Sequence, residues 1–208
     1  MKIGIVGSGN IGGTAARLFI NAGHEVAIAN SRGPDTLADL VAELGDRARA
    51  ATPEQAVAFG EAVLLASPWR LREQLPDAQL FYGKITIDAT NPYSEDFQVI
   101  DLEPSSSSEE MVKQLKGARV VKALNHLGSG DLGSAGRPGG GDERPVLFMA
   151  GDDEEAKQVV GRLIDDIGFA AVDTGDLPTG GRLQQAGSKL SAQLITEAEA
   201  PEALRDLP

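Results

Sequence analysis

A glycine-rich turn near the N-terminus has the residue types and the spacing that bind a phosphate group. Gly7-Ser8-Gly9-Asn10-Ile11-Gly12 matches the pattern G-x-G-x-x-G, directly after the apolar run Lys2–Val6 and before a stretch with helical periodicity. Gly7 would permit the tight turn, Gly9 would let a pyrophosphate approach the backbone, and Gly12 would let helix and strand pack closely. Free amides at the start of the helix would then face the phosphates.

The residues after the next apolar run bear on which dinucleotide is bound. Three of the chain's 25 glycines could fall at this spacing by chance, but the flanking strand and helix favour a dinucleotide site. NAD-preferring sites usually carry Asp or Glu here, whereas this chain has Asn30-Ser31-Arg32. A hydroxyl and a guanidinium can donate to a 2′-phosphate that a carboxylate would repel, so NADPH is favoured over NADH. The alternative is that Arg32 is a solvated surface arginine.

Two further turns are expected to flank the nicotinamide. Ala66-Ser67-Pro68-Trp69 and Ala89-Thr90-Asn91-Pro92 each place a polar residue and a proline after an apolar run. Ligands in open α/β sheets lie beyond the carboxyl ends of the strands, so the ring could rest between these turns. Trp69 either stacks near the ring or plugs the edge of the fold. Asn91 either donates to the carboxamide or caps its turn.

Candidates for catalysis follow another apolar run, Arg119–Ala123. Asn125 and His126 come directly after it, and His126 could orient an acceptor or move a proton near neutral pH. A lone histidine after a strand is more often structural. Lys122 is expected to be partly buried and paired, with a role at the site left open. The chain has no cysteine and two histidines, which excludes disulfides and thiolate chemistry, and no metal site is predicted.

The composition limits the partners. A length of 208 residues suits one large domain, and 19 basic against 31 acidic residues give a net charge of −12, which repels nucleic acid and anionic membranes. No apolar run approaches the length of a signal peptide or a membrane span, so a cytoplasmic location is expected. The predicted partner is a small redox acceptor, and a homodimer stays open.

The elements that must position these residues follow from alternating apolar runs and amphipathic stretches. Seven short runs are predicted as buried strands: Lys2–Val6, Glu25–Ala29, Ala62–Ala66, Lys84–Asp88, Arg119–Ala123, Val146–Ala150 and Ala170–Asp173. Helices are predicted at Ile11–Ala22 and Asp35–Leu44, each closed by a glycine. The alternation predicts an α/β fold with a doubly wound, mostly parallel sheet, the Rossmann fold.

Capping signals and two irregular segments complete the prediction. Capping boxes are predicted at Thr52 with Gln55, and at Ser107 with Glu110 before a helix over Met111–Lys116. The glycine-rich segment Gly128–Pro145 is interpreted as either a mobile lid or a surface loop, with no regular element. A helix is predicted from about Arg182 to Ala198. Residues 1–175 are thus expected to form the nucleotide-binding domain, and residues 176–208 a short helical extension that is not an independent domain.

Taken together, the motifs resemble those of the NADPH-dependent coenzyme F420 reductase family. They are G-S-G-N-I-G, N-S-R, A-S-P-W, D-A-T-N-P, V-V-K-A-L-N and M-A-G-D-D, and the resemblance covers about residues 1–175. The same fold occurs as the cytosolic domain of six-transmembrane metalloreductases. The resemblance implies hydride transfer between C4 of NADP and C5 of a deazaflavin. The NADP contacts that it implies are Ser8, Gly9, Asn10, Ile11, Ser31, Arg32, Ser67, Trp69 and Asn91.

The second substrate is less well defined. The resemblance implies that the loop from Asn125 to Ser129 lies near it, but the segments Gly128–Pro145 and Gly180–Ala198 depart from the family pattern. The acceptor could therefore be coenzyme F420, a flavin or another small redox-active molecule. Two other functions stay open: a dehydrogenase of a small imine or hydroxy acid, which usually needs a larger helical domain, and a non-catalytic NADPH sensor.

Overall fold

Eight strands form one sheet in the order β3-β2-β1-β4-β5-β6-β7-β8. The structure is a computed structural model and describes residues 1–205. The first six strands along the chain pair in parallel, β7 runs antiparallel to β6, and β8 is parallel to β7. The strands are β1 Lys2–Val6, β2 Glu25–Ala29, β3 Ala48–Ala51, β4 Ala62–Leu65, β5 Ile85–Asp88, β6 Arg119–Ala123, β7 Val146–Gly151 and β8 Ala170–Asp173. The predicted α/β fold with a mostly parallel sheet is confirmed.

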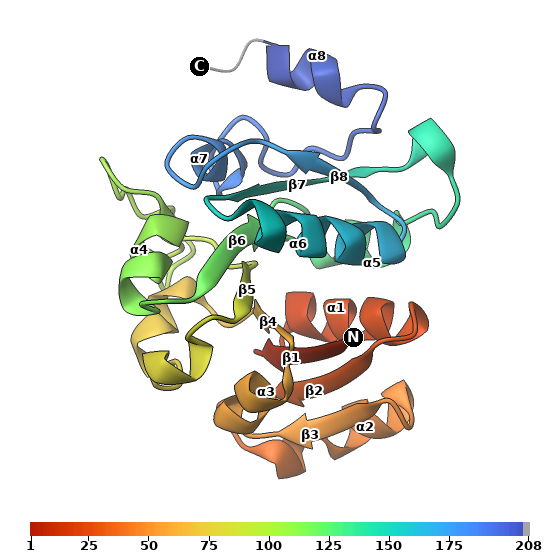
Figure 1. The fold of residues 1–208 in the computed structure, drawn as a ribbon, viewed down its shortest axis with the longest axis vertical. Coiled ribbons are helices and arrows are strands. Elements are labelled where there is room, and N and C mark those ends of the chain that lie inside the picture. Colours follow the sequence, from red (N-terminus) through yellow and green to blue (C-terminus); the bar gives the residue numbers. More distant parts are fainter. Residues whose placement is uncertain (206–208) are drawn as a thin grey trace.

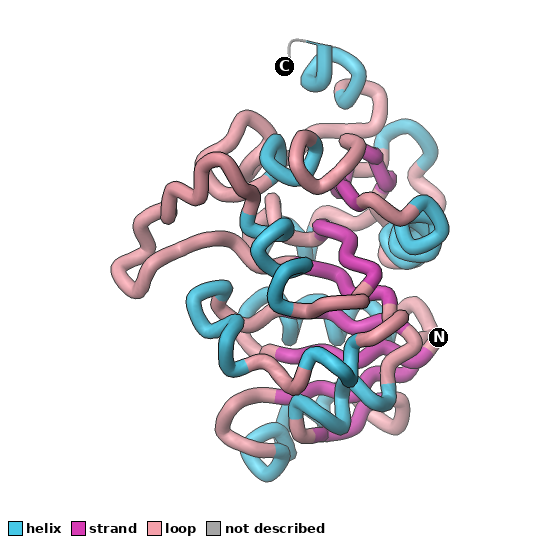
Figure 2. The backbone as a smooth tube through the Cα atoms, turned by 60° about the vertical axis from the view of Figure 1, so that its left-hand side comes forward, coloured by secondary structure: helices cyan, strands magenta, loops and turns pink. Residues whose placement is uncertain are grey.

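Helices cover both faces of this sheet (Figures 1 and 2). They are α1 Asn10–Asn21, α2 Ala38–Leu44, α3 Pro53–Phe59, α4 Ser107–Gln114, α5 Ser129–Ser134, α6 Glu154–Asp166, α7 Gly180–Gln184 and α8 Ala200–Arg205. Helices α1, α2, α5 and α6 share one core cluster with the sheet, and α3 and α4 belong to clusters on the other side. None of the helices within residues 1–205 has the length and apolar character needed to cross a membrane.

Side-chain alternation along the strands explains the two layers. Ile3 and Ile5 of β1 lie in the core under α1, where they contact the cluster that contains Phe19, while Val6 packs in the cluster on the opposite face. Helix α1 buries Ala15 and Phe19 and ends before Gly23, whose φ of 92° suits glycine. The predicted strands and the first helix are therefore where the apolar pattern places them.

One strand was missed because it carries no apolar run. Strand β3 contains three alanines and Arg49, and it forms the edge of the sheet beside β2. Arg49 pairs with Glu25 and lies over the ring of Phe59, with 4.4 Å from its guanidinium carbon to the ring centroid. A short edge strand of small residues lacks the periodicity on which strand prediction depends.

The capping box of α4 lies one residue earlier than predicted. Thr52 and Gln55 cap α3 as expected, but α4 uses Ser106 and Glu109 instead of Ser107 and Glu110. The run of serines and glutamates allows both registers. In the earlier register the Ser107 hydroxyl is free to accept a hydrogen bond in a buried network described below.

Two predictions about irregular segments were wrong. The glycine-rich segment 128–145 contains helix α5, whose Leu132 is fully buried in the core, and a single 3-10 turn at Gly141–Glu143. The continuous helix predicted over 182–198 does not form: α7 ends at Gln184, and Leu190 instead packs against Phe148 of β7. Tertiary packing thus overrides local pattern in both segments.

Further elements lie between the strands and at the chain's end. The predicted helix at 35–44 begins as a 3-10 turn, Pro34–Leu37, before α2, and two more 3-10 segments follow β4, Trp69–Gln74 and Ala78–Phe81. Ala200 of α8 belongs to the core cluster formed with β7 and β8. Figure 1 shows α8 at the opposite end of the molecule from β3.

Candidate functional site

A cleft of about 830 Å³ lies at the carboxyl ends of the parallel strands β1, β2, β4 and β5. This edge of a doubly wound sheet is where ligands bind, because the strand order reverses around β1. Twelve of the thirteen residues predicted to contact a dinucleotide line the cleft: Gly7, Ser8, Gly9, Asn10, Ile11, Asn30, Ser31, Arg32, Ser67, Pro68, Trp69 and Asn91. The thirteenth, Gly12, does not line it.

The glycine turn has the backbone that a pyrophosphate site requires. Gly7 has a φ of 112°, and a Cβ at this residue would collide with the backbone of Ala66 after β4. A Cβ at Gly12 would collide with the carbonyl oxygen of Gly7. Nothing lies within 4 Å of the position of a Cβ at Gly9. Two glycines are therefore needed for packing, while the third leaves open space where phosphates could approach the backbone.

The N-terminus of α1 lacks a protein cap. Gly9 occupies the N-cap position with no side-chain hydrogen bond, and the first turn has no acidic residue. By contrast, Thr52, Ser106 and Asp153 cap α3, α4 and α6 with their side chains. The first amides of a helix need acceptors and carry a partial positive charge, so an anionic group would satisfy them.

Asn30 joins the glycine turn to the loop after β2. Its side-chain nitrogen Nδ2 lies 3.3 Å from Ser8 Oγ and 3.0 Å from Thr36 Oγ1. Its Oδ1 accepts a hydrogen bond of 2.9 Å from the backbone nitrogen of Arg32. Asn30 thus orients the loop that presents Ser31 and Arg32, which is a positioning role that the sequence did not distinguish from direct contact.

Two arginines give this cleft a positive character. Arg32 and Arg70 line it, both are exposed, and their guanidinium groups make no ion pair or hydrogen bond within residues 1–205. No Asp or Glu is among the described lining residues, although the chain has 31 acidic residues. Because both guanidinium charges are uncompensated at the cleft, it favours an anionic ligand despite the net charge of −12.

Trp69 forms part of the wall and is fixed by protein contacts. Its side chain is only 4% exposed, and its Nε1 donates a hydrogen bond of 3.1 Å to the carbonyl oxygen of Ser107. The guanidinium carbon of Arg72 lies 3.9 Å from the centre of the Trp69 ring system. Of the two interpretations, these contacts favour the indole as a buried wall residue, at the border of the cleft.

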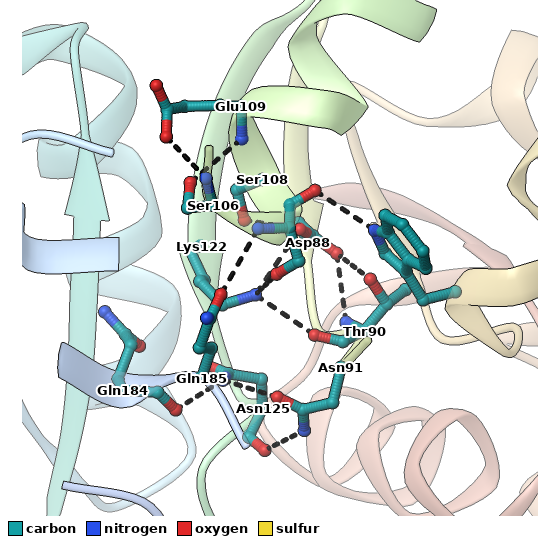
Figure 3. Close-up of polar contacts among 12 residues, drawn as sticks. Asp88, Thr90, Asn91, Ser106, Ser108, Glu109, Lys122, Asn125, Gln184 and Gln185 are labelled. Atoms are coloured by element: carbon teal, nitrogen blue, oxygen red, sulfur yellow. Dashed lines mark hydrogen bonds and ion pairs between the residues drawn. The ribbon is translucent and has the colours of Figure 1, made fainter. Parts of the chain in front are cut away.

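Both polar atoms of the Asn91 amide form hydrogen bonds inside the protein. Its Nδ2 donates to the carbonyl oxygen of Asn125 over 2.8 Å, and its Oδ1 accepts from the Ala186 backbone nitrogen over 2.9 Å. Asn125 in turn donates from Nδ2 to the carbonyl oxygen of Gln184, also over 2.8 Å (Figure 3). The structure therefore favours the turn-fixing interpretation of Asn91. Asn125 does not line the cleft but joins β6 to α7.

His126 lies away from the cleft. It is 3% exposed, and its ring centre lies 5.0 Å from that of Phe148 in β7. Burial lowers the pKa of His126 to about 4, and the nearby polar backbone of Val146 opposes this effect only in part. The ring is consequently neutral near pH 7 and not placed to exchange a proton with a ligand in the cleft.

A buried ion pair lies beneath the cleft, and only one of its two residues was predicted from the sequence. Lys122 and Asp88 are both completely buried, with 3.5 Å between Lys122 Nζ and Asp88 Oδ2 (Figure 3). Lys122 Nζ also donates to the Thr90 carbonyl oxygen over 3.0 Å and to Ser107 Oγ over 3.1 Å. Asp88 accepts from the backbone nitrogen and hydroxyl of Thr90 and from the hydroxyl of Ser108.

This network fixes the floor of the cleft. It holds the end of β5, the middle of β6 and the start of α4 together around Thr90, which lines the cleft. Burial lowers the pKa of Lys122, and the nearby carboxylate of Asp88 opposes that effect. Sequence reasoning singled out Lys122 but not Asp88, although an acidic residue ending a buried strand was a usable signal.

The N-terminal part of the sequence matches a known protein family. Residues 2–92 match the family described as "NADP oxidoreductase coenzyme F420-dependent". The chain belongs to this family. The match contains the glycine turn, Arg32 and the ends of β4 and β5, which line most of the cleft.

Three relatives extend the similarity over most of the chain. A hypothetical protein from Sinorhizobium meliloti is 33% identical, with a TM-score of 0.82 and coverage of 94% of this chain and 95% of the other. A proposed F420-dependent NADP reductase from Arthrobacter sp. FB24 is 28% identical, with a TM-score of 0.72 and coverage of 85% and 86%. Metalloreductase STEAP3 of Rattus norvegicus is 32% identical over 181 residues, 85% of this chain. The chain spans 34% of the length of that metalloreductase.

Proposed function

We propose that this member of the family binds NADPH in the cleft and transfers hydride between it and a small redox-active acceptor. The observation that carries the proposal is the cleft itself, which combines an open glycine turn, an uncapped helix N-terminus and an unpaired arginine after β2. The glycine turn and the helix N-terminus suit the pyrophosphate of NADPH, and the arginine suits its 2′-phosphate. Family membership makes an oxidoreductase the expected class.

The chain's residues suit the phosphates of this cofactor. The pyrophosphate would lie over Gly9 and the uncapped amides of α1. The 2′-phosphate would lie at Ser31 and Arg32, which can donate charge-assisted hydrogen bonds to it. Asn30 would keep both sites at a fixed separation, since it bonds to Ser8 and to the backbone of Arg32.

The nicotinamide end would lie near the ends of β4 and β5. NADPH supplies a hydride, two electrons with one proton, from C4 of its nicotinamide, and any second proton that the acceptor needs comes from water. Ser67 and Thr90 line this part of the cleft, and no carboxylate or imidazole is among the lining residues that the structure describes. Hydride transfer requires alignment and exclusion of water more than an acid or a base. The residues of the cleft therefore act by binding and orienting.

The acceptor is proposed to be a deazaflavin such as coenzyme F420, a flavin or another small redox-active molecule. The family description and the Arthrobacter relative support a deazaflavin, whereas the metalloreductase relative leaves room for other acceptors. Steady-state oxidation of NADPH, followed by absorbance, would be measured with F420, FMN, riboflavin, quinones and ferric chelates. Turnover with at least one acceptor is expected. NADPH binding without turnover with any of them would instead indicate a sensor.

A further inference from the structure

A hairpin borders the cleft beyond the end of β5. Within residues 92–100, Tyr93 pairs with Val99 as an antiparallel bridge. Ser94 donates its backbone N–H to Gln98 over 2.9 Å, and Ile100 donates to Pro92 over 2.7 Å. The hairpin is thus held by its own backbone bonds, and it presents Tyr93 and Phe97 to the cleft.

The conformation and exposure of Phe97 are unfavourable for the stability of the protein. Its side chain is 81% exposed, the largest exposure among the large apolar residues in the described part of the chain. Its φ of 60° falls in the left-handed region, which bulky side chains rarely adopt. An exposed aromatic ring on a strained backbone adds nothing to the core. Its place at the cleft makes a ligand the simplest reason for both features.

Arg70 lines the cleft at a different strand end from Arg32. It follows β4, whereas Arg32 follows β2, and β1 separates these two strands in the sheet. The neighbouring Arg72 is engaged with the ring of Trp69, but the guanidinium of Arg70 makes no ion pair or hydrogen bond within residues 1–205. If Arg32 binds the 2′-phosphate as proposed, Arg70 is left as a second cationic group of the cleft to which no part of the dinucleotide has been assigned.

We propose that Phe97 and Arg70 form the acceptor-binding end of the cleft, where Phe97 covers a planar aromatic ring and Arg70 binds an anionic group attached to it. The proposal rests on the proposed function, because it assumes that the dinucleotide occupies the other end. It predicts selection for acceptors that carry a phosphate or carboxylate, since no lining carboxylate opposes Arg70.

FMN and riboflavin test the role of Arg70, because they share one ring system and differ in a phosphate. Binding of each oxidised flavin to protein saturated with NADP⁺ would be measured by quenching of flavin fluorescence, which requires no turnover. FMN should bind roughly tenfold more tightly than riboflavin. Arg70→Ala should abolish this preference by weakening FMN alone, and Arg70→Lys should retain part of it. Equal affinity of the wild-type protein for both flavins, or no binding of either, would overturn the proposal.

Phe97→Gly tests the aromatic cover and separates it from a structural role. Glycine accepts the positive φ, so the melting temperature should stay the same or rise, while the affinity for both flavins falls. Unchanged flavin affinity in this variant would rule out the role of Phe97.

Two measurements keep the test specific. Arg162→Ala, at an exposed arginine of α6 that does not line the cleft, is the matched control and should behave as the wild type. NADP⁺ affinity would be measured for every variant. Loss of NADP⁺ binding in Arg70→Ala would contradict the acceptor role, whereas failure of the wild-type protein to bind NADP⁺ would contradict the proposed function itself.

Discussion

At the scale of single residues, we propose that the choice of NADPH over NADH depends on one side chain. Arg32 is exposed at the cleft and free of ion pairs within residues 1–205, while Asn30 fixes its backbone. Exposure alone does not distinguish an arginine that binds a ligand from any other surface arginine. The difference is that Arg32 lies in a cleft lined by no acidic residue, at the strand end where NAD sites carry a carboxylate.

Arg32→Ala should therefore weaken NADPH binding and leave NADH binding almost unchanged. The lost charge-assisted hydrogen bonds are worth about 1.5–3 kcal/mol, which corresponds to a roughly 10- to 150-fold higher Kd for NADPH. Isothermal titration with both nucleotides would measure the two effects. Equal weakening of both would mean that Arg32 does not contact the 2′-phosphate.

His126 affects stability instead of catalysis. Its pKa is about 4 in the folded protein, against 6.5 for an ordinary histidine, so only the unfolded chain takes up its proton between these values. The free energy of unfolding should fall as the pH decreases from 6.5 to 4, by about 3 kcal/mol from this group. His24, whose pKa burial also lowers, adds to the same trend.

Urea unfolding of the His126→Leu variant at a series of pH values would check this prediction. In the variant, the free energy of unfolding should decline much less between pH 6.5 and 4 than in the wild type. The part of the decline that is attributable to His24 should remain. If the free energy of unfolding of the variant depended on pH as steeply as that of the wild type, another group would be responsible. Replacing a neutral buried imidazole should leave the affinity for NADPH near that of the wild type, since His126 does not line the cleft.

At the scale of elements, the Asp88–Lys122 pair joins β5, β6 and the first turn of α4. A buried charge that loses its partner is strongly destabilising, whereas removing both charges costs less. Lys122→Met should lower the free energy of unfolding by about 3–5 kcal/mol, measured by urea denaturation. Adding Asp88→Asn should recover part of that loss; a fully additive double variant would show that the two charges do not interact.

The comparison between sequence and structure is also clearest at this scale. The seven apolar strands and the capping box of α3 follow from local chemistry, so the sequence predicts them. Twelve residues of the cleft were found because they follow these strands or lie in the glycine turn. Strand β3, the register of the α4 cap and the fold of the C-terminal segment depend on distant contacts, such as Leu190 against Phe148, which no local pattern encodes.

The same limit applies to the individual site residues. The types of Asn91, Asn125 and His126 suggested chemistry, but their amide and imidazole groups are used within the protein or buried away from the cleft. Several of their partners lie far along the chain, at Gln184, Ala186 and Phe148. Phe97 was not singled out because neither its exposure nor its positive φ has a signature in the sequence.

At the scale of the whole molecule, the account depends on how charge is distributed. The chain has an excess of twelve negative charges, yet within the described residues 1–205 the cleft is lined by two unpaired arginines and by no carboxylate. The acidic surface as a whole would repel most anions, whereas the arginines of the cleft create a local positive potential at one edge of the sheet. The sheet order places that edge where β2, β1, β4 and β5 end side by side.

The most direct test of this account is the affinity of the unmodified protein for NADPH and for NADH, measured by isothermal titration in the same buffer. The account predicts one site per chain and a Kd for NADPH at least about tenfold lower than that for NADH. Equal affinities, or no heat of binding for either nucleotide, would contradict it.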